Sequence, residues 1–328
     1  MKAAFYEARG AASEVLRVGQ MPEEAPGPGM VRVRVEASGV NPSDVKTRGG
    51  TGARPNPWPR TVPHQDGAGT IDLLGEGVDP ARLGQRVWLY ECQLDRPGGT
   101  AAQWVTVPQH LAVPLPDGVS FGVGAALGVP ALTAWHACER IDAGAGRCVL
   151  VHGAVGAVGF YAAQMARLRG ARVLASVSNA EQARTAAGAG IDTVPRGLDL
   201  PEAARQWLAR QGREDFDAFI DLDFAGNLQT NLALAANGAH IAAYASDTEL
   251  RPAIPVRDLM RRNLQLSFLL VYTMPAALKQ RAVEQLGNWL AAGALRHPAI
   301  HPYALDDIAS AHEAVETRRH AGKVVVLP

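Results

Sequence analysis

The segment CVLVHGAVGAVGFYAAQMARLRG, residues 148–170, limits the choice of fold more than any other part of the chain. An apolar run leads into three regularly spaced glycines, Gly153, Gly156 and Gly159, and an apolar stretch with helical character follows. A glycine loop between a strand and a helix is typical of dinucleotide binding, because backbone N–H groups and the helix N-terminus can face a pyrophosphate. Ala154 stands at the first glycine of the usual G-x-G-x-x-G pattern, so an ordinary strand-to-helix turn is the alternative.

Composition narrows the class of partner. The chain has 328 residues, and its 47% apolar content is enough for two hydrophobic cores. Lys plus Arg equals Asp plus Glu at 32 each, without long runs of one sign, which argues against nucleic acid or a membrane surface as the main partner. We therefore expect a small-molecule partner.

The sequence also indicates the compartment. The N-terminus lacks the apolar core of a signal peptide, and no apolar run approaches the roughly 20 residues that span a bilayer. Cys92, Cys138 and Cys148 are scattered, with no C-x-x-C pair. These features predict a cytoplasmic protein with reduced, mostly buried cysteines.

Hydrophobic periodicity predicts an α/β fold with two domains. Residues 1–119 read as short strands and turns, and MVRVRVEASGV alternates apolar and charged residues as a half-buried strand does. Residues 120–273 alternate strands with helices, which predicts a doubly wound, parallel, six-stranded sheet. Residues 274–328 end in a strand that we expect to return to the first domain.

Several motifs together resemble one family. SGVNPSDVKTRGG, PHQDGAG, GTAAQWVTVP, ALGVPALTAWHA, VLVHGAVGAVG and AHEAVETRRHAGKVVVLP are similar to segments of the zinc-independent, zeta-crystallin-like quinone oxidoreductases of the medium-chain dehydrogenase/reductase superfamily. The resemblance implies a GroES-like catalytic domain, residues 1–119 completed by 274–328, and a Rossmann domain, residues 120–273. It also implies NADPH as hydride donor and a substrate cleft between the domains.

The resemblance assigns residues near the nicotinamide. Asn41 and Asp44 match the family's active-site polar pair, with positioning favoured over direct proton transfer by Asp44. The local alternative is that Asn41 and Pro42 start a turn and that Ser43 or Asp44 caps a short helix. Thr133 matches a position beside the nicotinamide, and a hydroxyl bonded within its own helix is the alternative.

Further candidates for cofactor contact follow the predicted strands, because open α/β sheets bind ligands at the carboxyl ends of their strands. Some of them are expected to belong to the core instead. They are the loop residues Ala154, Val155, Gly156, Ala157 and Val158, with Tyr244, Ser246, Phe268 and Leu270 at two later strand ends.

Phosphate preference is predicted from the end of the second strand of the sheet. An acidic residue about 20 positions past the glycine loop favours NAD, and here Ser176, Ser178 and Asn179 stand in that region. Arg196 supplies positive charge for a 2′-phosphate, assisted by Arg184 or Arg318, although each can be an ordinary surface arginine. The family often has Lys where Gln182 stands and Tyr where Arg196 stands, which weakens the preference for NADPH.

Zinc-dependent relatives place Cys about where this chain has Asn41, and a His-Glu pair where it has Gln65 and Asp66. His64 lies one position away and is expected to be a loop residue. The sequence therefore predicts no metal site. His152, directly before the glycine loop, is expected to help seat it.

These observations predict an NADPH-dependent oxidoreductase that transfers hydride to a quinone or conjugated enone, as a homodimer or homotetramer. One alternative is a 2-enoyl thioester reductase on the same fold. Another is a nucleotide-binding protein with a crystallin-like or RNA-binding role and no enzymatic activity.

Overall fold

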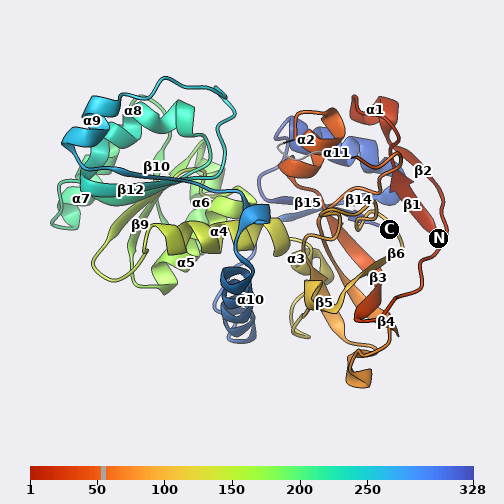
Figure 1. Cartoon of the computed structure of the whole chain (residues 1–328). Helices are drawn as coiled ribbons and strands as arrows, with labels where there is room; N and C mark the ends of the chain where they lie inside the picture. Colours follow the sequence, from red (N-terminus) through yellow and green to blue (C-terminus); the bar gives the residue numbers. More distant parts are fainter. Residues whose placement is uncertain (53–56) are drawn as a thin grey trace. The chain divides into compact units, whose positions relative to one another are not determined.

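The computed structural model describes residues 1–52 and 57–328 (Figure 1). The chain forms two compact units: unit 1 contains residues 1–130, 283–294 and 298–328, and unit 2 contains residues 131–282 and 295–297. The predicted boundaries lay at 119/120 and 273/274. The first boundary differs because the short helix at residues 121–124 packs on unit 1, where a side chain at Gly124 would meet Ala68 at 2.7 Å.

Unit 1 is the β-rich part of the chain. Its elements are β1 (Lys2–Phe5), α1 (Ala12–Val15), β2 (Arg17–Gln20), β3 (Met30–Gly39), α2 (Pro42–Gly49), β4 (Asp66–Leu74), η1 (Pro80–Arg82), β5 (Arg86–Leu89), β6 (Trp104–Pro108), η2 (Gln109–Leu111), β7 (Ala112–Pro114), α3 (Phe121–Gly124), β14 (Ile300–Ala304), η4 (Leu305–Asp307), α11 (Ile308–Glu316) and β15 (Lys323–Leu327). The main sheet of the described residues has the order β14-β15-β3-β4-β5-β7, with β6 also paired to β3. The last strand, β15, pairs with β3 through Val325–Gly39 and Val326–Ser38, so the predicted return of the C-terminus is confirmed.

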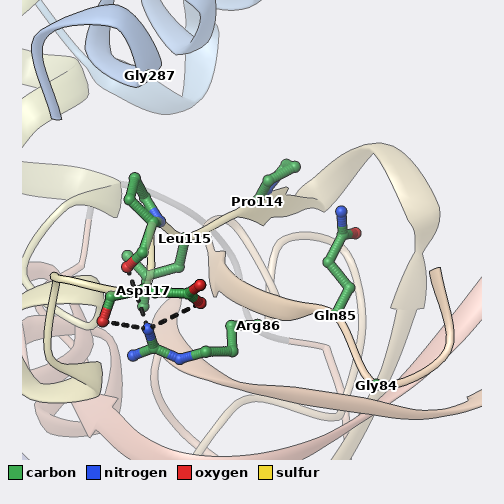
Figure 2. Close-up of a pocket in the computed structure, with 8 residues that line it drawn as sticks. Gly84, Gln85, Arg86, Pro114, Leu115, Asp117 and Gly287 are labelled. Atoms are coloured by element: carbon green, nitrogen blue, oxygen red, sulfur yellow. Dashed lines mark hydrogen bonds and ion pairs between the residues drawn. The ribbon is translucent and has the colours of Figure 1, made fainter. Parts of the chain in front are cut away.

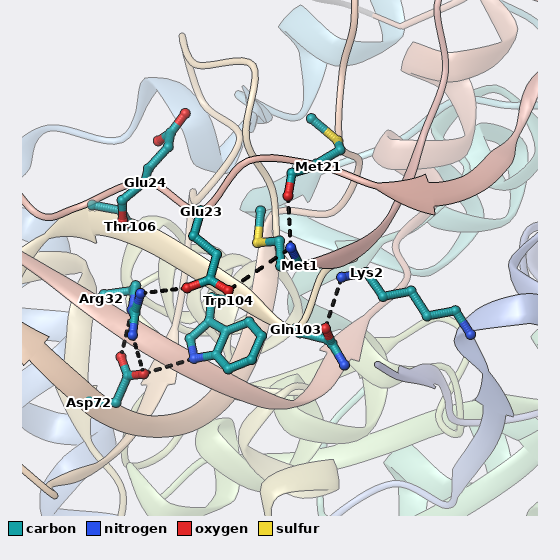
Figure 3. Close-up of polar contacts among 10 residues, drawn as sticks. All are labelled: Met1, Lys2, Met21, Glu23, Glu24, Arg32, Asp72, Gln103, Trp104 and Thr106. Carbon is teal, nitrogen blue, oxygen red and sulfur yellow. Dashed lines mark hydrogen bonds and ion pairs between the residues drawn. The ribbon is translucent and has the colours of Figure 1, made fainter.

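The central strand β3 shows why its sequence alternates. Val31, Val33 and Val35 are buried, as the apolar positions predict. On the other face, Arg32 forms two hydrogen bonds to the Asp72 carboxylate of β4, at 3.0 and 2.8 Å, and Trp104 of β6 donates to the same carboxylate at 2.8 Å (Figure 3). The polar positions of β3 therefore join it to its neighbours, while the apolar positions fill the core.

Unit 2 contains the strands and helices that alternate along the sequence. Its elements are α4 (Gly128–Arg140, which begins in unit 1), β8 (Cys148–Val151), α5 (Ala157–Leu168), β9 (Arg172–Val177), α6 (Ala180–Gly188), β10 (Asp192–Pro195), α7 (Leu200–Arg210), β11 (Phe216–Asp221), α8 (Phe224–Leu234), β12 (Ala235–Ala243), α9 (Val256–Arg261), β13 (Gln265–Phe268), η3 (Val271–Thr273) and α10 (Ala276–Ala291, which ends in unit 1). Helices α8 and α9 lie on one side of the sheet and α4 and α5 on the other (Figure 1).

The sheet of unit 2 is six-stranded and entirely parallel, in the order β10-β9-β8-β11-β12-β13. Numbered along the chain this is 3-2-1-4-5-6, the Rossmann order, and the predicted fold is confirmed. The order reverses beside β8, whose four residues are fully buried. Whatever follows β8 therefore lies at the switch point, where such sheets bind ligands.

The cysteines and the helix lengths can also be compared with the sequence. All three cysteines are free and buried, and burial raises the pKa of the Cys92 and Cys138 thiols to about 12, as expected for unreactive core residues. Within residues 1–52 and 57–328, every helix is too short or too polar to span a bilayer.

Candidate functional site

Three glycines shape the loop between β8 and α5, each for a different reason. Gly153 has a φ of +77°, and a side chain there would also meet Leu222 at 2.6 Å. A Cβ at Gly159 would lie 2.2 Å from the Gly153 carbonyl oxygen, so only glycine lets α5 approach the loop this closely. At Gly156 the nearest atom to an added Cβ is 3.6 Å away, which leaves this part of the loop open.

The open part of the loop is the start of a helix. Gly156 is exposed and is the N-cap of α5, while Ala157 and Val158 form its first turn. The N–H groups of that first turn have no acceptor within the helix, so they can donate to an anion. Ala154 and Val155 are buried, so they form the inner side of the loop.

Ser176 has a different place from the one expected for a phosphate ligand. It is only 3% exposed, and its hydroxyl oxygen accepts the Gly153 N–H at 3.1 Å. Its carbonyl oxygen accepts the Ala154 N–H at 3.0 Å. Both hydrogen bonds tie the end of β9 to the glycine loop, so the hydroxyl faces the protein interior.

The other candidates for phosphate contact lie at the carboxyl ends of β9 and β10, which are neighbours in the sheet. Ser178 and Asn179 are exposed, and the Asn179 side chain caps α6 by accepting the Gln182 N–H at 2.9 Å. The Gln182 side chain accepts the Ser178 N–H at 2.8 Å. Arg196 is exposed directly after β10. The fold thus brings these four residues to one edge.

The candidates after β12 and β13 have mixed surroundings. Phe268 is 64% exposed and packs edge-on against Phe224, with ring centroids 5.1 Å apart. The Ser246 hydroxyl donates to the Glu249 carbonyl at 2.7 Å, and Tyr244 and Leu270 are half-buried. These side chains mark the predicted edge of the sheet, but Ser246 already has a partner within its own loop.

The two remaining cofactor candidates come from different units. Thr133 is buried in α4 and belongs to unit 2. Arg318 belongs to unit 1, is exposed, and has a positive φ of 50° just after α11. Neither position by itself assigns a ligand contact.

In unit 1, Asn41 and Asp44 form the cap of α2. Asn41 is the N-cap residue, and its N–H donates to the Asp44 carboxylate at 2.8 Å. Both side chains are nearly covered, with 1% and 5% of their surface exposed. A capped helix is therefore present, as the local alternative expects, but its N-cap is Asn41 and Asp44 is its third residue, whereas the cap was expected at Ser43 or Asp44.

The Asn41 amide belongs to a buried network that the sequence analysis missed. Asn41 Nδ2 donates to Asp66 Oδ2 at 2.8 Å, and Lys323 Nζ donates to Asn41 Oδ1 at 2.5 Å. Lys323 Nζ also lies 3.2 Å from Asp66 Oδ2. Since an ammonium only donates and a carboxylate only accepts, these partners fix the amide orientation. One signal was visible: Lys323 starts an apolar strand that ought to be buried.

The Asp66 carboxylate also contacts the start of α4. Its second oxygen accepts the Val129 N–H at 2.9 Å, one of the free N–H groups of the first helical turn. A Cβ at Gly128 would lie 2.1 Å from the same oxygen. Asp66 is completely buried, so these three donors replace its solvation.

The donor set around Asp66 does not suit zinc. Asn41 offers an amide whose oxygen is already used, and the Lys323 ammonium repels a second cation. In the part of the chain that the structure describes, no three His, Cys, Asp or Glu side chains converge as a metal site.

His64 and Gln65 form hydrogen bonds with side chains other than Asp66. His64 Nδ1 is 2.7 Å from the Ser38 hydroxyl, and its Nε2 is 2.9 Å from Nε2 of His312. Gln65 donates to Gln93 at 3.0 Å. Burial lowers the pKa of both histidines, that of His312 to about 3, as expected for neutral core imidazoles.

A hollow of about 610 Å³ on unit 1 contains none of the predicted site residues. Figure 2 shows Arg86 directed toward Asp117 there. The Arg86 guanidinium donates to the carbonyls of Pro116 and Asp117, at 3.1 and 2.8 Å, so it is hydrogen-bonded to the adjacent loop. We do not assign a ligand to this hollow.

Burial makes Asp44 sensitive to pH. Desolvation, and then the nearby Asp66 carboxylate, raise the pKa of Asp44 to about 7, and desolvation also raises the pKa of Asp66. The folded state therefore binds the Asp44 proton more tightly than the unfolded state. The resulting stabilisation is complete below about pH 4 and is lost as pH rises through about 7.

We predict that Asp44→Asn removes this pH dependence. An asparagine Oδ1 can still accept the Asn41 N–H, but it carries no charge. Between pH 4 and 8 the free energy of unfolding of the wild type should fall relative to the variant by roughly 1–4 kcal/mol. Urea unfolding at several pH values measures the difference, and parallel curves would contradict the prediction.

Comparisons with known proteins agree with this fold. Residues 27–117 match the family model for the alcohol dehydrogenase GroES-like domain, and residues 189–326 match that for zinc-binding dehydrogenases. The quinone oxidoreductase of Lama guanicoe is 31% identical over 304 residues, which cover 90% of this chain and 88% of that protein.

Similar solved structures include two that cover the whole of this chain and are themselves covered completely. The quinone oxidoreductase of Thermus thermophilus, also determined in complex with NADPH, has 30% identity and a TM-score of 0.83. An NAD-dependent alcohol dehydrogenase has 28% identity and a TM-score of 0.89.

Proposed function

The chain belongs to the quinone oxidoreductase family of the medium-chain dehydrogenases/reductases, and from this premise we propose that it transfers hydride from NADPH to a quinone or conjugated enone without zinc. We propose unit 2 as the cofactor-binding domain and unit 1 as the catalytic domain. The oligomeric state and the cytoplasmic location remain predictions from the sequence.

The glycine loop carries this proposal. Gly159 brings α5 against the loop, and Gly156 leaves the helix N-terminus open at the switch point of the sheet. A pyrophosphate fits such a position because it accepts hydrogen bonds from backbone N–H groups and needs close approach to the backbone. Ser178, Asn179 and Arg196, at the next two strand ends, are the residues we propose for the 2′-phosphate.

In the proposed reaction the bound NADPH supplies the hydride, and the protein supplies geometry and polar groups. Lys323 and Asp66 take up the Asn41 oxygen and one amide hydrogen, so the orientation of the amide is fixed beside the Asp44 carboxyl. Asp44, with its pKa near 7, can hold a proton at neutral pH. We assign both residues to positioning and charge stabilisation, with the proton arriving from water.

Zinc independence rests on the donor set around Asp66. The Lys323 ammonium brings a positive charge within 3.2 Å of the carboxylate that a metal would need. Alcohol oxidation requires a Lewis acid or base on the hydroxyl, whereas a quinone accepts hydride with little help. We therefore propose that acceptor reduction, and not alcohol oxidation, is the activity.

A panel of acceptors tests the proposal. We expect NADPH oxidation with ortho- and para-quinones, unchanged by chelators, and no rapid NADP⁺-dependent oxidation of simple alcohols. Faster turnover of 2-enoyl thioesters would instead support the thioester reductase. A protein that binds NADPH but reduces none of these acceptors would support the role without enzymatic activity.

Gly156→Val tests the loop. The nearest atom to an added Cβ is 3.6 Å away, so the fold should persist while the side chain blocks approach to the pyrophosphate. We expect NADPH affinity to fall at least about tenfold in fluorescence titrations, with the melting temperature nearly unchanged. Unaltered affinity in a folded variant would exclude Gly156 from the binding site.

Arg196→Glu tests the preference for NADPH. Wild-type kcat/KM should be higher with NADPH than with NADH, and the substitution should lower the NADPH value about tenfold or more while sparing NADH. Arg210→Glu is the matched control, because it makes the same charge change at the exposed C-terminal end of α7, away from the strand ends that carry the site. A wild type that prefers NADH would refute the preference.

A further inference from the structure

A buried polar chain lies directly beneath the glycine loop of unit 2. It contains Ser176 at the end of β9, His152 after β8, Asn231 on α8 and Asp221 at the end of β11. Each of these side chains is at most 3% exposed. Three strands of the sheet and one helix therefore contribute side chains to one buried cluster next to the loop.

The hydrogen bonds among these four side chains have a fixed direction, set by Asp221. A carboxylate only accepts, so Asn231 Nδ2 donates to Asp221 Oδ2 at 2.7 Å. The Asn231 oxygen then faces His152 Nε2 at 2.8 Å, and that nitrogen must carry the hydrogen. The His152 ring is therefore oriented by a carboxylate that it does not touch.

The opposite side of the ring faces the loop. With hydrogen on Nε2, His152 can use Nδ1 as an acceptor, and Nδ1 lies 3.5 Å from the Ser176 hydroxyl. When this hydroxyl points its hydrogen at His152, its oxygen lone pairs face the Gly153 N–H, 3.1 Å away. The serine thus holds Gly153, whose φ of +77° sets the course of the loop.

Asp221 is itself held by neutral donors among the described residues. Its other oxygen accepts the Asp223 N–H at 2.8 Å and the Asn227 side chain at 2.7 Å. A buried charge held by neutral donors is a costly way to fill a core, because apolar side chains of similar volume do it as well or better. A fixed arrangement of the neighbouring groups is what such a network supplies.

We propose that Ser176, His152, Asn231 and Asp221 are positioning residues for the pyrophosphate, acting by holding the Gly153 end of the glycine loop in its binding conformation. This inference rests on the proposed function, since it assumes that the loop binds NADPH. Ser176 is thereby assigned to the loop and not to the 2′-phosphate.

Ser176→Ala and Asn231→Leu interrupt the row of hydrogen-bonded side chains at its two ends, at the loop and next to Asp221. The matched control is Ser267→Ala, because Ser267 is also a buried serine of the same sheet, bonded to His240 at 2.8 Å. NADPH affinity, kcat with a quinone at saturating NADPH, and amide hydrogen exchange of peptides covering residues 152–159 are measured for each protein.

We expect Ser176→Ala and Asn231→Leu to raise the NADPH dissociation constant about 3–10-fold and to speed exchange of the loop, with kcat within about twofold of wild type. The NADPH dissociation constant of the double variant should rise by less than the product of the two single effects, because both substitutions interrupt the same row of hydrogen bonds. Ser267→Ala should change neither affinity nor loop exchange.

Wild-type affinity and loop exchange in Ser176→Ala would overturn the proposal, even if Asn231→Leu fails to fold. So would an equal loss of affinity in Ser267→Ala, which would indicate general destabilisation. If the wild type itself does not bind NADPH, the proposed function fails, and the positioning of a pyrophosphate fails with it. Amide hydrogen exchange of the loop then still shows whether the row of hydrogen-bonded side chains orders Gly153.

Discussion

The buried Asp66 carboxylate connects three segments of unit 1 that are far apart in the sequence. It joins the residue before α2, the first residue of β15 and the first turn of α4, through Asn41, Lys323 and Val129. Removing one partner of such a buried pair leaves an uncompensated charge, which typically costs about 3–5 kcal/mol. The same contacts fix the Asn41 amide, so the stability of the unit and the geometry of the candidate site depend on one carboxylate.

In unit 2 a second buried carboxylate has the corresponding role. There the Asp221 carboxylate orients neutral side chains, and the last of them holds the backbone of the glycine loop. In both units a buried acid sets the direction of the polar groups next to a candidate binding surface. This arrangement suits a reaction in which the protein contributes position and electrostatics while the cofactor contributes the hydride.

Much of the fold was predicted from local pattern. The alternation in β3, the six parallel strands of unit 2 and the return of β15 are confirmed, because burial of one or both strand faces leaves its mark every second residue or in continuous apolar runs. A capped helix in this segment was also predicted, but the cap was expected at Ser43 or Asp44 and is Asn41, whose N–H donates to Asp44 three positions on. The burial of the Ser176 hydroxyl was not predicted, because strand periodicity does not show what a small polar side chain meets inside a sheet.

The sequence by itself determined the strand, loop and helix around Gly156, because φ preference, close packing and helical periodicity are properties of neighbouring residues. It also determined the family, through motifs spread along most of the chain. Only the tertiary structure decided which polar groups meet: Lys323 lies 257 positions from Asp66, and Asn231 lies 79 positions from His152. Such pairs leave no periodic signal, because their partners are chosen by how strands are ordered in a sheet and not by spacing along the chain.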